Sequence, residues 1–320
     1  MGSITNLKNN GKINFIINVH DGIGDMLTGG VIAFHYLAYL LAKEGHNVYM
    51  FAKPEYSHKN IYTLTSQNNN TDKDRNTASA WQWEEFSFLH KNTVAIYDQT
   101  KHGNWFDTKN VVRWFLYNQN NNDIEKTWGE NDYYFCYGKQ KSVVNVSKKQ
   151  DWGELIAMNF YFEIFKNNNN KYRSGFCHLN NKHSSSKSHI FTKELNSTSL
   201  DNWKSLGCHR YLNQEFNKHE YFLCYDQLSF WPQIAALCGC KVITMNVKDN
   251  LNTYYDYNTT PQEYRLDNPL KKYGVAFGFD DLQHAINTQH LVKDHLVEMD
   301  KYNKNTIKEF IKFWENKCYA

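Results

Sequence analysis

The first fifty residues contain the feature that most restricts the fold, a strand-like run followed by a glycine-rich turn and a helix. Lys12–Val19 is apolar and of strand length, and residues 20–30 then supply four glycines. Val31–Glu44 has the small, apolar face of a helix that Gly45 can end, and Asn47–Phe51 is strand-like again. This order predicts a βαβ unit with parallel strands and a right-handed crossover.

Short apolar runs repeat this alternation along the rest of the chain. The runs that we predict as strands are Asn92–Tyr97, Tyr133–Tyr137, Arg173–Leu179, Glu220–Cys224, Val242–Asn246 and Gly274–Phe277. The predicted helices are Asn110–Tyr117, Asp280–Thr288 and a long amphipathic segment, Leu291–Trp314. The fold class is therefore α/β, with two Rossmann-like, doubly wound domains over residues 1–155 and 156–295. A C-terminal helix, residues 296–320, is expected to pack across the domains.

Length, charge and cysteine content limit the class of protein. A chain of 320 residues suits two domains, and a net charge of +3 does not require nucleic acid or an acidic membrane as a partner. The seven cysteines are scattered among apolar residues, which indicates buried free thiols in a reducing compartment. Met1–Gly11 is polar, so no signal peptide is expected, and no apolar run reaches the roughly 18 residues of a membrane span. We expect a cytoplasmic protein, and the sequence does not indicate its oligomeric state.

The segment Tyr225–Ile243 is typical of a loop, a helix and a strand. Ser229 or Asp226 can cap the start of the helix, Pro232 suits its first turn, and Gly239 can end it. The free N–H groups and positive dipole end of a helix N-terminus can also hold a phosphate. An ordinary capped helix explains the same residues equally well, and Ala235–Cys240 is expected to be core.

The glycine spacing of the first turn argues against a nicotinamide-dependent enzyme. Gly22 and Gly24 are followed by Gly29 and Gly30, not by a glycine at the third offset of the dinucleotide fingerprint. No acidic residue closes the predicted strand Asn47–Phe51, where such enzymes bind the ribose.

Several short segments follow one another in a fixed order over residues 13–290. Each segment alone is a weak signal, but the ordered set is specific. They are HDGIGD at 20–25, Tyr97-Asp98-Gln99 with Gly103-Asn104-Trp105 and Val111-Val112-Arg113-Trp114, Arg173–Cys177 with Lys182, Tyr225–Cys240, and Gln262–Arg265 with Tyr273–Asp281. Together they resemble the two-Rossmann-domain (GT-B fold) glycosyltransferases, and more narrowly a bacterial and viral group of predicted sugar transferases. The chain departs from that group's pattern at Asp98-Gln99, Trp105, Asn181 and Gln227.

The resemblance implies transfer of a hexose or deoxyhexose from a UDP- or GDP-linked donor to a glycan, glycoprotein or other hydroxyl acceptor. The donor is expected in a central cleft between the domains, with no cofactor and no metal. The chain's Asp-x-Asp motif, Asp72-Lys73-Asp74, lies in a polar, irregular stretch and not at a strand end. Whether the configuration at the anomeric carbon is retained or inverted is left open.

The same resemblance suggests roles for individual residues. The expected donor-binding residues are Arg173, Lys182, Tyr225, Asp226, Ser229 and Glu263, with Gly22 and Gly24 lining the cleft and His20, Asp21 and Asp25 as catalytic candidates. A solvated basic loop, a helix cap and plain turn formers are the competing interpretations of these residues. Arg113 is more simply a structural ion-pair partner.

Two other functions fit the same sequence. One is another α/β enzyme that modifies sugar nucleotides, such as an epimerase. The other is a non-catalytic carbohydrate-binding protein, in which the aromatic residues, 16% of the chain, would line an open sugar surface.

Overall fold

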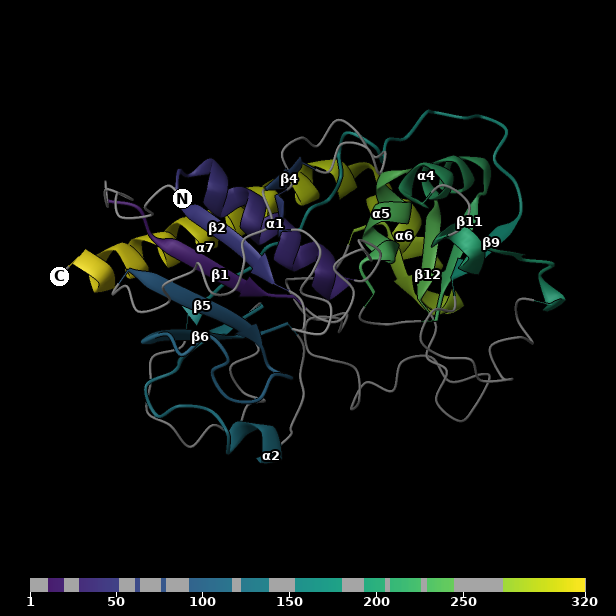
Figure 1. Cartoon of the computed structure of the whole chain (residues 1–320). Helices are drawn as coiled ribbons and strands as arrows, with labels where there is room; N and C mark the ends of the chain where they lie inside the picture. Colours follow the sequence, from purple (N-terminus) through teal and green to yellow (C-terminus); the bar gives the residue numbers. More distant parts are fainter. Residues whose placement is uncertain are drawn as a thin grey trace. The chain divides into compact units, whose positions relative to one another are not determined.

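The protein contains two compact α/β units (Figure 1). The computed structural model describes residues 11–19, 29–51, 61–63, 76–78, 92–116, 122–137, 153–179, 193–204, 208–225, 229–244 and 273–319. The first unit is formed by Met1–Asn159 together with Asp300–Ala320, and the second by Phe160–Met299. Each unit is built on its own parallel sheet, so the predicted α/β class with two Rossmann-like sheets is confirmed.

The sheet of the first unit has six parallel strands in the order β2-β1-β5-β6-β7-β8. They are β1 (Asn14–Asn18), β2 (Asn47–Phe51), β5 (Thr93–Asp98), β6 (Asn110–Phe115), β7 (Tyr133–Cys136) and β8 (Gly153–Glu154). Helix α1 (Gly29–Lys43) joins β1 to β2 and ends before Gly45, whose φ is +95°, which confirms the predicted βαβ unit. Two short antiparallel strands, β3 (Ile61–Thr63) and β4 (Asn76–Ala78), and the one-turn helix α2 (Asn122–Glu125) complete the unit.

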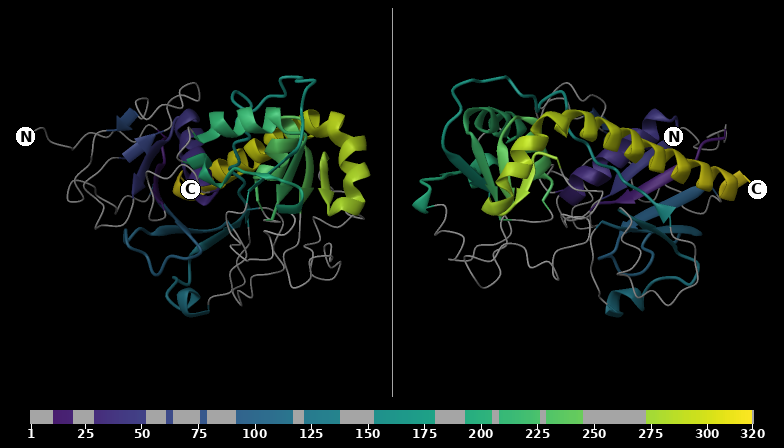
Figure 2. Two further views of the ribbon diagram at one scale, coloured as in Figure 1. Left: turned by 90° about the vertical axis from the view of Figure 1, so that its right-hand side faces the viewer. Right: turned by 180° about the vertical axis from the view of Figure 1, so that it is seen from behind.

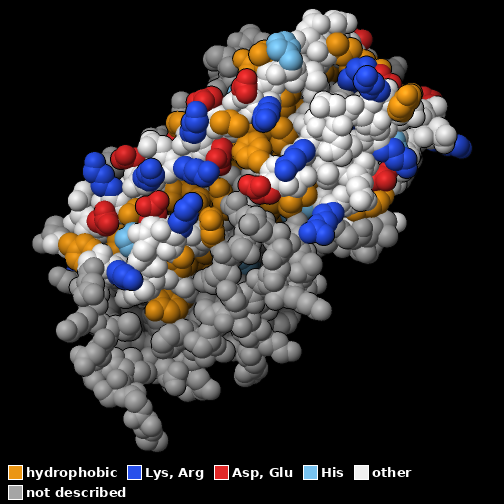
Figure 3. Space-filling view, turned by 90° about the horizontal axis from the view of Figure 1, so that it is seen from above, with side chains coloured by type: hydrophobic (Ala, Val, Ile, Leu, Met, Phe, Trp, Pro, Cys, Tyr) orange, Lys and Arg blue, Asp and Glu red, His pale blue; other side chains and the backbone are white. Residues whose placement is uncertain are grey.

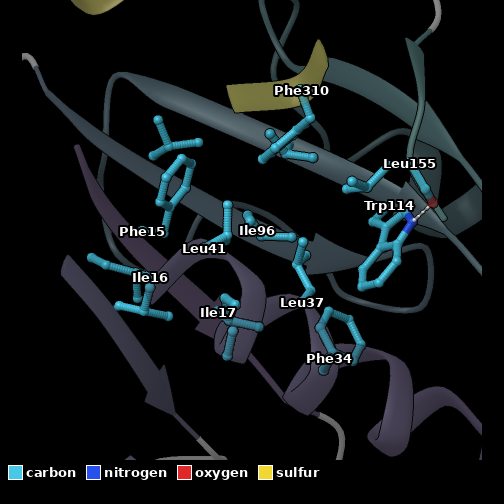
Figure 4. Close-up of a cluster of buried hydrophobic side chains, with 14 of the residues drawn as sticks. Phe15, Ile16, Ile17, Phe34, Leu37, Leu41, Ile96, Trp114, Leu155 and Phe310 are labelled. Carbon is cyan, nitrogen blue, oxygen red and sulfur yellow. Dashed lines mark hydrogen bonds between the residues drawn. The ribbon is translucent and has the colours of Figure 1, made fainter. Parts of the chain in front are cut away.

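Helix α1 and the C-terminal half of α7 (Val292–Tyr319) pack on this sheet (Figure 4). From α1, Phe34 meets Trp114 edge-on at 5.0 Å between ring centroids. From α7, Phe310 contacts Phe15 at 5.8 Å and Phe135 at 4.8 Å. These rings bury both helices against the strands. The predicted C-terminal helix forms, as one uninterrupted helix (Figure 2), while its packing across the domains stays a prediction.

The prediction of a helix over Asn110–Tyr117 is wrong, because Asn110–Phe115 is strand β6. The strand lies between β5 and β7, and Val111–Phe115 are each at most 4% exposed. A strand buried on both faces of a parallel sheet is a continuous apolar run, which short periodicity does not distinguish from a helix. Arg113 interrupts that run, and its Nε donates to Asp132 Oδ2 at 2.8 Å, so the predicted structural ion pair is confirmed.

The sheet of the second unit has five parallel strands in the order β10-β9-β11-β12-β13. They are β9 (Phe176–Leu179), β10 (Thr198–Ser199), β11 (Tyr221–Cys224), β12 (Lys241–Thr244) and β13 (Val275–Phe277). The helices are α4 (Cys208–Lys218), α5 (Trp231–Leu237) and α6 (Leu282–Thr288), with single 3₁₀ turns η4 (Asp201–Lys204), η6 (Phe279–Asp281) and η7 (Gln289–Leu291).

The surface carries charges of both signs. On the face in Figure 3, basic and acidic side chains alternate over the described residues, with hydrophobic side chains between them. No described helix combines the length and apolarity that crossing a membrane requires.

Candidate functional site

Each sheet has one place where the strand order reverses. In the second unit the chain passes from β9 to β10 on one side and to β11 on the other. In the first unit it passes from β1 to β2 on one side, and β5 lies on the other. The connections leave such a point in opposite directions, which opens a crevice at the carboxyl ends of the strands where open α/β sheets bind ligands.

Tyr225 lies at this point of the second unit, directly after β11. Its side chain is 3% exposed, and its hydroxyl has no hydrogen-bond partner among the described residues. Burial raises the pKa of Tyr225, so the phenol stays neutral and keeps its proton. A buried O–H without a partner is costly, and it can donate to an oxygen of a ligand.

His178 accompanies Tyr225 from the neighbouring strand β9. Leu223 pairs with His178 in the sheet, so Tyr225, two residues further on, belongs to the same face. The two rings meet edge-on, with centroids 6.4 Å apart, and His178 Nδ1 lies 3.0 Å from Ser197 Oγ. His178 is not among the site residues predicted from the sequence. A histidine in the otherwise apolar run FCHL, between the predicted site residues Arg173 and Lys182, could have indicated a polar residue at the site.

Ser229 does not cap α5 as predicted, because the N-cap position is held by Phe230, which makes no side-chain cap bond, and Ser229 lies one residue before it. Its Oγ accepts a hydrogen bond from the Trp231 N–H at 3.3 Å, and Pro232 is the second residue of the helix. The helix ends before Gly239, whose φ is +99°, and all seven of its residues are buried. Cys238 and Cys240 are free and fully buried, so the predicted core role of this segment is confirmed.

Arg173 has contacts that differ from those of a diphosphate ligand. Its guanidinium donates to the carbonyl oxygens of Phe216 and Cys238, both at 2.6 Å, and to the side-chain oxygens of Asn167 at 2.9 Å and Asn217 at 3.0 Å. Phe216 and Cys238 lie at the C-terminal ends of α4 and α5, where a cation meets the negative dipole ends. Arg173 also precedes β9, so it lies at the edge of the sheet opposite the carboxyl ends. We therefore leave Arg173 out of the proposed donor site.

The other predicted site residues cannot be placed. His20, Asp21, Gly22, Gly24, Asp25, Lys182, Asp226 and Glu263 lie outside the described residues, and so does Asp72-Lys73-Asp74. Their roles stay predictions. Within the described ranges, no three His, Cys, Asp or Glu side chains come together in a way that could hold a metal ion.

Comparison with known proteins gives a distant structural likeness. No protein-family model matches the chain, and no curated protein matches its sequence. Sucrose-phosphate synthase from Thermosynechococcus elongatus is 12% identical over 97% of this chain and 94% of that one, with a TM-score of 0.44. T4 phage BGT, in complex with its UDP-glucose substrate, is 10% identical over 96% and 97%, also with a TM-score of 0.44. At these values, any function for this chain rests on its own residues and sheet topology.

Proposed function

We propose that the chain is a GT-B glycosyltransferase that moves a sugar from a nucleotide-sugar donor to a hydroxyl acceptor. The observation that carries the proposal is the pair of parallel α/β units, each with a reversal of strand order. The ordered segments that resemble this family, from HDGIGD to Tyr273–Asp281, support the same function from the sequence.

On the donor side, the proposal uses the carboxyl edge of the second unit. Tyr225 is buried there with an unshared hydroxyl, which suits a hydrogen bond to an oxygen of the nucleotide sugar. Lys182, Asp226 and Glu263 join it on the strength of the resemblance. A departing diphosphate needs a compensating positive charge, and with Arg173 occupied elsewhere, Lys182 is the proposed source.

On the acceptor side, transfer needs a route for the proton of the attacking hydroxyl. The proposed groups are His20, Asp21 and Asp25, which follow β1 in the sequence, and one of them would act as base if the configuration is inverted. We propose a metal-independent reaction, since charge on the leaving group can be balanced by a side chain and by backbone N–H groups.

A donor screen tests the proposal. We expect UDP or GDP to raise the melting temperature, and the matching nucleotide sugars to be hydrolysed or transferred at the same rate with and without EDTA. Tyr225→Phe removes one oxygen from the proposed donor pocket, so it should weaken nucleotide-sugar binding about tenfold, the effect of roughly one lost hydrogen bond. Tyr172→Phe is the matched control, since Tyr172 is 90% exposed in the same unit.

Two outcomes would contradict the proposal. Stabilisation by NAD but by neither UDP nor GDP would favour a cofactor-dependent sugar-nucleotide enzyme instead. Binding of glycans without any nucleotide binding would favour a non-catalytic carbohydrate-binding protein. Loss of activity with EDTA would refute the metal-independent mechanism while leaving the transferase in place.

A further inference from the structure

Buried polar groups without partners gather at the carboxyl edge of the first unit's sheet. Asn18, the last residue of β1, is 1% exposed, and neither its amide nitrogen nor its amide oxygen bonds to any described residue. Asp98, the last residue of β5, and Gln99 are each 3% exposed. Asp98 Oδ2 and Gln99 Nε2 likewise have no partner within the described part of the chain. Buried polar atoms are nearly always paired, so these need an explanation.

The second polar atom of Asp98 and of Gln99 is hydrogen-bonded within the protein. Asp98 Oδ1 accepts from the Thr100 N–H at 2.6 Å and from the Thr100 hydroxyl. Gln99 Oε1 accepts from the Leu116 N–H at 3.1 Å, at the end of the neighbouring strand β6. These bonds fix how Asp98 and Gln99 are turned and leave one carboxylate oxygen and one amide NH2 group unshared. Such an arrangement is preorganised for a ligand.

The position of these groups in the sheet is where a ligand is expected. β1 and β5 are parallel neighbours with Ile17 paired to Ile96, so the two strands end within a residue of each other, at Asn18 and Asp98. The strand order reverses between them. Because side chains alternate along a strand, Asn18 and Asp98 point to opposite faces, and a ligand over the edge can be reached from both.

The chemistry of the free atoms selects the ligand. Asn18 offers a donor and an acceptor, Asp98 Oδ2 an acceptor, and Gln99 Nε2 a donor. Hydroxyl groups both donate and accept, so vicinal hydroxyls match this set, whereas a phosphate would meet the Asp98 carboxylate. Two nearby cations are engaged elsewhere. Arg113 binds Asp132 and the carbonyl oxygens of residues 101 and 103, and Lys101 Nζ lies 5.7 Å from the ring centroid of Trp105.

We propose that Asn18, Asp98 and Gln99 form a binding site in the first unit for a neutral, polyhydroxylated ligand such as a saccharide. The inference rests on the proposed function, under which this ligand is the sugar acceptor. It goes beyond that function by assigning acceptor recognition to named side chains and by excluding a phosphorylated or otherwise anionic acceptor at this position.

Paired substitutions test the site. Asp98→Asn keeps the shape and removes the charge, and Asn18→Leu removes the amide at similar volume. Asn92→Leu is the matched control, because Asn92 is also 1% exposed and its Oδ1 also has no partner among the described residues, but it lies at the opposite edge of the sheet, away from the reversal of strand order, and its Nδ2 donates to Tyr319 Oη at 3.4 Å. The probes are a panel of neutral mono- and disaccharides, glucose and maltose among them, measured by saturation-transfer NMR and calorimetry.

We expect wild type to bind at least one saccharide of the panel. Asn18→Leu and Asp98→Asn should weaken that binding at least tenfold, and Asn92→Leu should keep it. Asn18→Leu should also raise the melting temperature, since it removes an unpaired buried amide. Unchanged saccharide binding in both site variants, or no saccharide binding by wild type, would overturn the site.

Measuring nucleotide binding in the same variants separates this inference from the proposed function. UDP and GDP binding should be the same in wild type and both site variants. If wild type binds a saccharide through Asn18 and Asp98 but binds neither nucleotide, the site stands and the transferase fails. If wild type binds UDP or GDP but no saccharide, the proposed transferase function stands and the saccharide site fails.

Discussion

At the scale of single residues, Arg173 shows what the sequence can and cannot predict. Arg173 is recognisable as a basic residue at the start of the predicted strand Arg173–Leu179, and the strand forms as β9 from Phe176 onwards. Whether the arginine lies at the amino or the carboxyl edge of the sheet, and which carbonyl groups face it, depends on where α4 and α5 end in space. Asn18 makes the same point, because neither its burial nor its missing partner can be inferred from a polar residue at a strand end.

We expect Arg173→Ala to destabilise the second unit by about 2–4 kcal/mol. The substitution leaves several carbonyl and amide oxygens without their charged donor, and bonds to charged groups are the strong ones. Urea unfolding measures the loss, with Arg210→Ala as control, since Arg210 is exposed on α4. If stability is instead unchanged while UDP or GDP binding weakens tenfold or more, Arg173 is a donor ligand after all.

At the scale of helices and strands, hydrophobic pattern and glycine position predicted most elements. The strand Asn47–Phe51 has the predicted bounds, and α1 and α5 end next to the predicted glycines, Gly45 and Gly239. The strand β6 was mistaken for a helix because a six-residue run buried on both faces has no polar side to reveal its period. The pattern of polar and apolar residues did not predict that aromatic side chains of α4, η4 and α5 pack against one another.

His209, in the first turn of α4, lies among those aromatic rings. Its ring centroid is 4.6 Å from that of Tyr161 and 5.8 Å from those of Phe165, Trp203 and Trp231. Burial lowers the pKa of His209 from its ordinary 6.5 to about 4. The unfolded chain therefore binds a proton between pH 6.5 and 4 that the folded chain does not. Stability should fall as the pH falls through this window, by at most about 3 kcal/mol from this group.

Chemical denaturation at pH 7 and pH 4.5 measures this effect. We expect His209→Phe to reduce the stability difference between the two pH values by about 2–3 kcal/mol, because the aromatic variant cannot take up a proton. His290→Gln is the control, since His290 is exposed. His46 and His295, whose pKa values burial also lowers, should leave a smaller remaining slope of the same sign. An undiminished slope in His209→Phe would contradict the prediction.

At the scale of the whole molecule, the first unit is assembled from two distant parts of the chain. Residues 300–320 belong to it, although residues 160–299 form the other unit. Trp314 of α7 is fully buried and meets Tyr133 edge-on at 5.0 Å between centroids, close to Phe313 at 5.2 Å. The stability of the N-terminal sheet thus depends on the last helix of the chain.

Trp314→Ala should therefore unfold or loosen the N-terminal sheet and leave the second unit intact. Replacing a fully buried tryptophan by alanine costs about 3–5 kcal/mol, because transfer and cavity terms add. Hydrogen exchange should show faster exchange in β1, β5 and β6, with unchanged protection in β9, β11 and β12. Lys308→Ala, on the exposed side of α7, should change neither set. If β9, β11 and β12 instead lose protection together with β1, the two units unfold as one, and the prediction is wrong.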